Sequence, residues 1–186
     1  MTTPGSFATA LRTVATTTLS ATLVRRVPLS PLIASGKVDY LFTSGRPYRF
    51  NTAGVMCIYF AEDEHTAAAE YERHTQPLRQ PFATFFAEVK LKMILDLCSA
   101  ECLETLNLTP SDLQANWARA KTPTLTQILG ETLSQQSRIS AIRFPSDAAR
   151  LIGFKGANVV IFREALGRSD YLRILGPTRQ PLQKWP

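Results

Sequence analysis

The sequence predicts an α+β fold: one compact domain, residues 1–186, with a largely antiparallel, mixed sheet flanked by helices. A chain of 186 residues with 45% hydrophobic content can bury a single core of its own. Over residues 84–97 apolar and polar side chains alternate with period two, which is typical of an antiparallel strand with one solvated face. Strand-like and helix-like segments also follow one another without the regular alternation of a parallel βαβ protein.

The first part of the chain contains a predicted helix, a strand and a loop. We expect residues 7–18 to form a short helix and residues 20–27 to form a strand that ends at Pro28, because proline cannot donate to a strand ladder. A loop is expected after it, marked by Pro31, Gly36 and Gly45. The N-terminal residues 1–22 are rich in Ser, Thr and Ala, so they are interpreted either as a leader or as a helix of the domain.

The middle of the chain predicts a buried strand followed by a helix. Residues 55–60, "VMCIYF", form a compact β-branched and aromatic run, which is typical of a buried strand. The next segment, "EDEHTAAAEYERH", opens with acids that suit the positive end of a helix dipole and continues with strong helix formers. Residues 84–97 then predict one long strand or a bent pair of strands.

The second half predicts three short helices and three strands. Ser99 can cap a helix that runs through Leu106, and Pro110 can begin a helix with Leu113 and Trp117 on one side. Thr122 and Pro123 repeat that start signal for "TLTQILGETL". Strand-like runs follow at residues 140–144, 158–162 and 171–175.

The net charge and the cysteines limit which ligands, metal sites and cellular compartment can be expected for this protein. The net charge of +6 suits an anionic ligand, an acidic partner or a nucleic acid. The basic residues are scattered and form no basic helix with interleaved aromatics, so no direct nucleic-acid binding is expected. Three cysteines without C-x-x-C spacing, and only His65 and His74 beside them, predict reduced thiols in a cytoplasmic protein with no metal. No apolar run is long enough to span a membrane.

Standard catalytic motifs are missing from the sequence: it contains no G-x-G-x-x-G, no P-loop and no G-x-S-x-G. What is left is a series of three polar residues on three consecutive elements. Arg49 lies in a turn, Tyr59 ends the predicted strand, and Glu70 lies on the next helix. Taken one at a time, each residue also fits a role without function: a turn arginine is usually a solvated charge, a strand tyrosine usually belongs to the core, and a helix glutamate usually lies on the surface. His65 and His74, on the same helix, are expected to face solvent.

Taken together and in order, these residues resemble the RES-domain family, the toxin halves of bacterial toxin–antitoxin pairs. The resemblance covers roughly residues 23–165. Where many members have two glycines before the turn arginine, this chain has Pro47-Tyr48, and the spacing to Tyr59 and Glu70 selects Arg49 over Arg46. The matching pieces are Arg26, the turn Arg49-Phe50-Asn51, Gly54, Tyr59, Glu70, "TQILG" (126–130), "FPS" (144–146) with Ser146, and "GANVVIF" (156–162) with Asn158.

The resemblance implies an ADP-ribosyltransferase-like fold and NAD as the substrate, whose nicotinamide–ribose bond is cleaved by hydrolysis or phosphorolysis. It implies catalytic roles for Arg49, Tyr59 and Glu70. The carboxylate would stabilise an oxocarbenium-like ribose, the tyrosine would stack on nicotinamide, and the arginine would hold the pyrophosphate. The residues implied to contact NAD are Arg26, Arg49, Asn51, Tyr59, Ser146 and Asn158.

The resemblance also implies a protein partner, an antitoxin with a helix-turn-helix domain. Whether the chain forms a homo-oligomer stays open at this point. Two other functions stay open at this point. One is a mono-ADP-ribosyltransferase that modifies a protein target on the same scaffold. The other is a non-catalytic module that acts through its basic surface.

Overall fold

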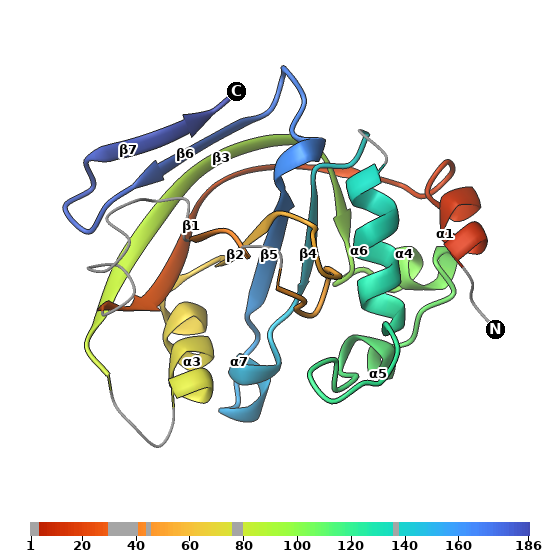
Figure 1. Ribbon diagram of the computed structural model, residues 1–186, viewed down its shortest axis with the longest axis horizontal. Helices are drawn as coiled ribbons and strands as arrows, with labels where there is room; N and C mark the ends of the chain where they lie inside the picture. The colour runs from red at the N-terminus through yellow and green to blue at the C-terminus, as the bar shows by residue number, and fades with distance from the viewer. Residues whose placement is uncertain (1–3, 30–40, 44–45, 76–79, 136–137) are drawn as a thin grey trace.

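The computed structural model of the chain describes residues 4–29, 41–43, 46–75, 80–135 and 138–186. It confirms the predicted α+β architecture: a strongly curved mixed sheet carries helices on one side and along one end (Figure 1). The predicted loop around Pro31, Gly36 and Gly45 lies outside the described residues. None of the helices in the described residues is long and apolar enough to cross a membrane.

The sheet has the strand order β1-β2-β5-β4-β3-β6-β7, and β1 also pairs with β3. The first five strands of that order therefore close into a ring, from which β6 and β7 extend as a hairpin (Figure 1). All pairings are antiparallel except β3 with β4, which is parallel. The strands are β1 Thr17–Pro28, β2 Cys57–Ala61, β3 Phe82–Asp96, β4 Ala141–Pro145, β5 Ala157–Phe162, β6 Tyr171–Leu175 and β7 Pro181–Trp185.

The predicted period-two segment is the single long strand β3, not a bent pair of strands. One of its edges pairs with β1 along nearly the whole length of both strands. The other edge pairs first with β6 and then with β4. A strand with two neighbours on one edge needs this length, and β3 thereby joins the ring to the hairpin.

Two large hydrophobic cores occupy the two faces of the ring. One cluster draws side chains from all five ring strands, including Leu23, Ile58 and Val159, and so fills the inside of the ring. The other cluster includes Phe162 and Leu129 and lies outside the ring beneath the helices. β5 is buried at all six positions because both of its faces are covered, which accounts for its continuous apolar sequence.

Helix boundaries follow local capping chemistry, and three of them correct the predictions. The first helix ends at Ala10, because the chain enters β1 at Thr17. The helix after Pro110 ends at Leu113, so Trp117 lies beyond it. Helix α6 begins at Leu125, because Thr124, and not Thr122, receives the backbone N–H of Gln127. The helices are α1 Pro4–Ala10, α3 Glu64–Thr75, α4 Ala100–Thr105, α5 Pro110–Leu113, α6 Leu125–Gln135, α7 Asp147–Leu151 and the 3₁₀ helix η2 Arg163–Ala165.

Other predictions are confirmed or corrected residue by residue. Ser99 caps α4 as expected. Tyr59 is the central residue of β2 and not its end, because the ladder with β5 continues to Ala61. α7 and β7 were not predicted from the sequence. All three cysteines are free, and only Cys98 is exposed.

Candidate active site

The turn between residues 46 and 54 is held together by side chains. The Phe50 N–H donates to the Tyr59 hydroxyl at 2.9 Å, and that hydroxyl donates to Asn51 Oδ1 at 3.1 Å. The Asn51 amide Nδ2 donates to the Arg46 carbonyl at 2.7 Å. Because Asn51 is fully buried, these bonds fix the turn rigidly and determine where Arg49 points.

Helix α6 supports the same turn from outside. The Gln127 amide donates to the Tyr48 carbonyl at 2.9 Å. A side chain at Gly130 would meet the Phe50 carbonyl oxygen at 1.7 Å, so only glycine allows the helix to approach this closely. The "TQILG" segment therefore has a structural explanation, since two of its residues hold the turn.

Arg49 connects the turn to two helices. Its Nη2 lies 3.0 Å from Asp147 Oδ2 at the start of α7, and its Nη1 donates to the Leu113 carbonyl at the end of α5. The arginine side chain is only 18% exposed. Arg46, by contrast, is exposed, so the structure places Arg49 and not Arg46 next to α7.

Glu70, Ser146 and Asn158 form a directly hydrogen-bonded cluster. Glu70 Oε1 accepts from Ser146 Oγ at 2.7 Å and from Asn158 Nδ2 at 2.6 Å. The three residues come from α3, from the N-cap of α7 and from β5. Ser146 and Asn158 are buried, whereas the Glu70 side chain is 26% exposed. The result is a carboxylate held in one orientation and still reachable from solvent.

The close packing of α3 against α7 makes this cluster possible. A Cβ atom at Gly156 would lie 2.2 Å from Thr66 Oγ1 of α3 and 2.9 Å from Ala149 Cβ of α7. Glycine therefore lets the start of β5 pass between the two helices. Asp63 accepts from the Thr66 backbone N–H at 2.8 Å and so caps α3 in the position that carries Glu70.

The Tyr59 hydroxyl is used in hydrogen bonds within the protein, with Phe50 and Asn51. Burial raises its pKa well above the ordinary value of a tyrosine, so the phenol is neutral. Its ring lies 6.0 Å from the Tyr48 ring and meets the Phe144 ring edge-on at 6.4 Å, and the residue is partly exposed. What Tyr59 offers to a ligand is ring surface and not an ionised oxygen.

Arg26 lies apart from this hydrogen-bonded network. Its guanidinium stacks over the Phe82 ring at 4.7 Å. The Nε atom is buried and has no hydrogen-bond partner among the described residues. A ligand cannot reach a buried atom, so this Nε by itself marks no ligand site; Arg26 as a whole is partly exposed, and its guanidinium has further N–H donors.

The structure thus brings together most of the residues singled out in the sequence. Asp147 adjoins Ser146 in the chain, so the Arg49 ion pair borders the Glu70 cluster, while Tyr59 and Asn51 share the turn with Arg49. Sequence reasoning missed Asp147, although its place just after a proline and a capping serine is a helix-start signal. It also missed the pairing of His74 with Glu70, 3.7 Å apart. His65 and His74 are exposed, as predicted.

A comparison with family models decides the classification: the model of the RES domain matches residues 24–180. The chain belongs to the RES-domain family. The match confirms the predicted resemblance and extends it through β6. A comparison with curated proteins finds no match.

Solved structures support the fold of this RES domain. A chain in the crystal structure of the M. tuberculosis MbcT–MbcA toxin–antitoxin complex is similar, with a TM-score of 0.61 over 93% of each chain. The two sequences are 17% identical, so the similarity concerns the fold.

Proposed function

We propose that this RES-domain protein is the toxin of a toxin–antitoxin pair and that it breaks the nicotinamide–ribose bond of NAD. The observation that carries the proposal is the Glu70 carboxylate, fixed by Ser146 and Asn158 and still partly exposed. Breaking an N-glycosidic bond develops positive charge on the ribose. A carboxylate that is already oriented stabilises that charge without reorganising during the reaction.

Two arginines supply the charge that a pyrophosphate needs. Arg26 is partly exposed and its Nε has no hydrogen-bond partner among the described residues, and Arg49 has N–H groups beyond the two that bind Asp147 and Leu113. Charge-assisted hydrogen bonds from such groups are worth about 1.5–3 kcal/mol each. Arg49 would hold a phosphate while the ribose meets Glu70, and Arg26 would add a second cation from β1.

The remaining residues position the reacting groups. Ser146 Oγ donates to Glu70 and accepts from the Ala149 N–H, so it orients the carboxylate. Asn158 has the same effect from β5. Tyr59 provides partly exposed ring surface for the flat nicotinamide. Asn51 accepts a hydrogen bond from the Tyr59 hydroxyl and so holds the ring in a fixed position relative to the turn.

Release of nicotinamide from NAD tests the activity directly. Purified protein should release nicotinamide with water or with added phosphate as the acceptor. Labelled NAD distinguishes the outcomes: small labelled products indicate hydrolysis or phosphorolysis, whereas a labelled protein indicates ADP-ribosyl transfer. If no nicotinamide forms under any of these conditions, the proposed reaction is wrong.

Substitution of Glu70 tests the residue at the centre of the proposal. Glu70→Gln should reduce nicotinamide release by at least about a thousandfold, because a neutral amide cannot balance the developing charge. Glu72→Gln is the matched control, since Glu72 is exposed two residues further along the same helix and should keep full activity. Equal activities of the two variants would exclude Glu70 from catalysis.

A toxin of this kind needs a protein that neutralises it. The similar solved chain comes from a toxin–antitoxin complex, and we propose an antitoxin with a helix-turn-helix domain, encoded by the neighbouring gene, as the partner. Expression of the chain alone should stop growth, and co-expression of the neighbouring protein should restore it. Growth arrest by Glu70→Gln as strong as by the wild type would separate toxicity from NAD cleavage.

A further inference from the structure

A hollow of about 360 Å³ lies between the 46–54 turn and the segment that joins α5 to α6. Its volume is in the range of small-molecule pockets. One wall comes from the turn, and the opposite wall comes from the joining segment and the first residues of α6. The lining residues are Pro47, Thr52, Ala53, Trp117, Ala118, Ala120, Lys121, Thr122, Pro123 and Gln127.

The hollow is connected to the Glu70 cluster through two consecutive residues of the turn. The Tyr48 ring lies 5.5 Å from the Trp117 ring of the hollow and 6.0 Å from the Tyr59 ring of the site. Arg49, the next residue, pairs with Asp147, which adjoins Ser146. In Figure 1, α3, α7 and the α5 segment follow one another along the lower end of the molecule, in the same order as these contacts. Arg49 therefore lies between the fixed carboxylate and the hollow.

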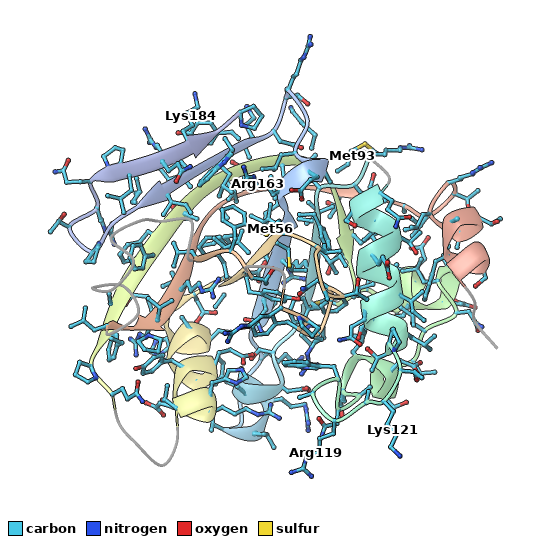
Figure 2. All side chains as sticks on the ribbon, viewed as in Figure 1. Met56, Met93, Arg119, Lys121, Arg163 and Lys184 are labelled. Carbon is cyan, nitrogen blue, oxygen red and sulfur yellow. The ribbon has the colours of Figure 1, made fainter. Side chains whose placement is uncertain are left out.

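The lining of the hollow favours a flat ligand with negative charge. Trp117 is partly exposed and offers an indole surface, on which heteroaromatic bases stack well. Among the described residues that line the hollow, Lys121 is the charged one and none carries a carboxylate. Figure 2 shows the Lys121 and Arg119 side chains projecting at this end of the molecule. The Thr52 and Thr122 side chains add donors and acceptors for the edge of a base or a sugar.

We infer that this hollow binds the adenosine end of the dinucleotide, with the adenine against Trp117 and a phosphate within reach of Lys121. The inference rests on the proposed function, because the nicotinamide end is assigned to Glu70. The assignment of the hollow follows from the order of the contacts along this end of the molecule. Glu70 would meet the ribose, Arg49 would hold the pyrophosphate, and the hollow with Trp117 would take the second base. The protein would then hold NAD by both ends and would bind AMP without any nicotinamide group.

Trp117 itself reports on this binding. The chain has two tryptophans, so Trp185→Phe leaves Trp117 as the single indole. In that variant, AMP should change the tryptophan fluorescence in a saturable manner, and nicotinamide mononucleotide should not. A change of equal size with nicotinamide mononucleotide, or none with AMP, would overturn the assignment of the hollow.

A charge reversal tests the role of Lys121. In the Trp185→Phe variant, Lys121→Glu should weaken AMP binding at least about tenfold, because a charge-assisted contact becomes a repulsive one. Lys184→Glu makes the same change in total charge on β7, at the opposite end of the molecule (Figure 2), and should leave AMP binding unchanged. Equal weakening by both variants would indicate only a general effect of net charge and would overturn the proposal.

The two proposals fail in different ways. Normal nicotinamide release together with no AMP binding would remove the hollow from the substrate site and leave the NAD-cleaving activity standing. Saturable AMP binding at Trp117 together with no nicotinamide release would support the hollow as an adenosine site and would contradict the proposed reaction.

Discussion

The Ser146 hydroxyl makes two hydrogen bonds that serve different purposes. It accepts from the Ala149 N–H at 3.1 Å and so caps α7. It also donates to Glu70 at 2.7 Å and so orients the carboxylate. The same oxygen therefore contributes to the stability of a short helix and to the geometry of the site.

A pair of alanine substitutions separates these two roles. Ser146→Ala and Ser99→Ala each remove an N-cap serine, from α7 and α4 respectively, and each should lower the free energy of unfolding by about 1 kcal/mol. Only Ser146→Ala should also lower nicotinamide release, by about ten- to a hundredfold, because Glu70 loses a donor that holds it in place. Urea unfolding and the nicotinamide assay measure the two effects. Unchanged turnover in Ser146→Ala would mean that Asn158 alone orients Glu70.

The Cys57 thiol makes the stability of the protein sensitive to alkaline pH. Cys57 is fully buried, and this burial raises its pKa from 9.0 to about 12. Between these two values the thiol is ionised in the unfolded chain and protonated in the folded one. The unfolded state thus binds fewer protons, and the free energy of unfolding falls as the pH rises. Burial of Tyr59 acts in the same direction at higher pH.

We expect Cys57 alone to lower the free energy of unfolding by about 1 kcal/mol between pH 9 and pH 10. Cys57→Ala should be less stable at pH 7, because it leaves a cavity, and its stability should fall less steeply above pH 9. A smaller decline persists, since the pKa of Cys102 is also raised, to about 11. Urea unfolding of both proteins at pH 7, 9 and 10 measures the slopes, and identical slopes would contradict the burial argument.

At the scale of elements, the approach of α6 to the 46–54 turn depends on one glycine. Gly130 faces the Phe50 carbonyl so closely that a methyl group would overlap it. Phe50 is fully buried and packs against Phe144 at 4.6 Å, so the turn has no room to retreat. A side chain at position 130 would therefore have to push helix α6 away from the turn.

Gly130→Ala should reverse the usual effect of alanine in a helix. Alanine normally stabilises a helix interior by about 1 kcal/mol relative to glycine. Here we expect destabilisation by at least about 2 kcal/mol, together with reduced nicotinamide release, because the displaced turn carries Arg49. Thermal unfolding and the nicotinamide assay test this, with the half-buried Thr132→Ala on the same helix as control. A more stable Gly130→Ala protein would show that the helix can shift freely.

At the scale of the whole molecule, closure of the five-stranded ring decides which parts are most stable. β5 lies between β2 and β4 and is buried at every position. β7 lies at the outer edge of the hairpin, pairs only with β6 and is mostly exposed. The family match also ends at residue 180, before β7 begins. The hairpin edge should therefore open without unfolding the ring.

Hydrogen exchange measures this difference. The amides of β5 should exchange only through global unfolding and should be the slowest in the chain. The amides of β7 should exchange orders of magnitude faster, because local fraying exposes them. Peptide-resolved exchange at neutral pH can compare residues 157–162 with residues 181–185. Similar protection of the two strands would indicate that the hairpin and the ring unfold as one unit.

The sequence alone determined most of the strands and helices, although not α7 or β7, and it determined the order of the candidate residues along the chain. The period-two pattern of β3, the cap at Ser99 and the apolar run of β5 depend on neighbours a few residues away, so they can be recognised locally. Because the sequence patterns are local, they cannot choose between two nearby start signals, which explains the wrong prediction for the start of α6. Thr122 and Thr124 are both suitable helix caps, and only the reciprocal bonds with Gln127 choose Thr124.

Only the tertiary structure decided what the candidate residues contact. Glu70 meets Ser146 and Asn158, 76 and 88 residues away, and Arg49 meets Asp147 after 98 residues. The hollow beside Trp117 also depends on segments distant in the chain. Such contacts follow from the strand order that closes the ring, and the strand order results from burying two cores at once. No local pattern in the sequence encodes it.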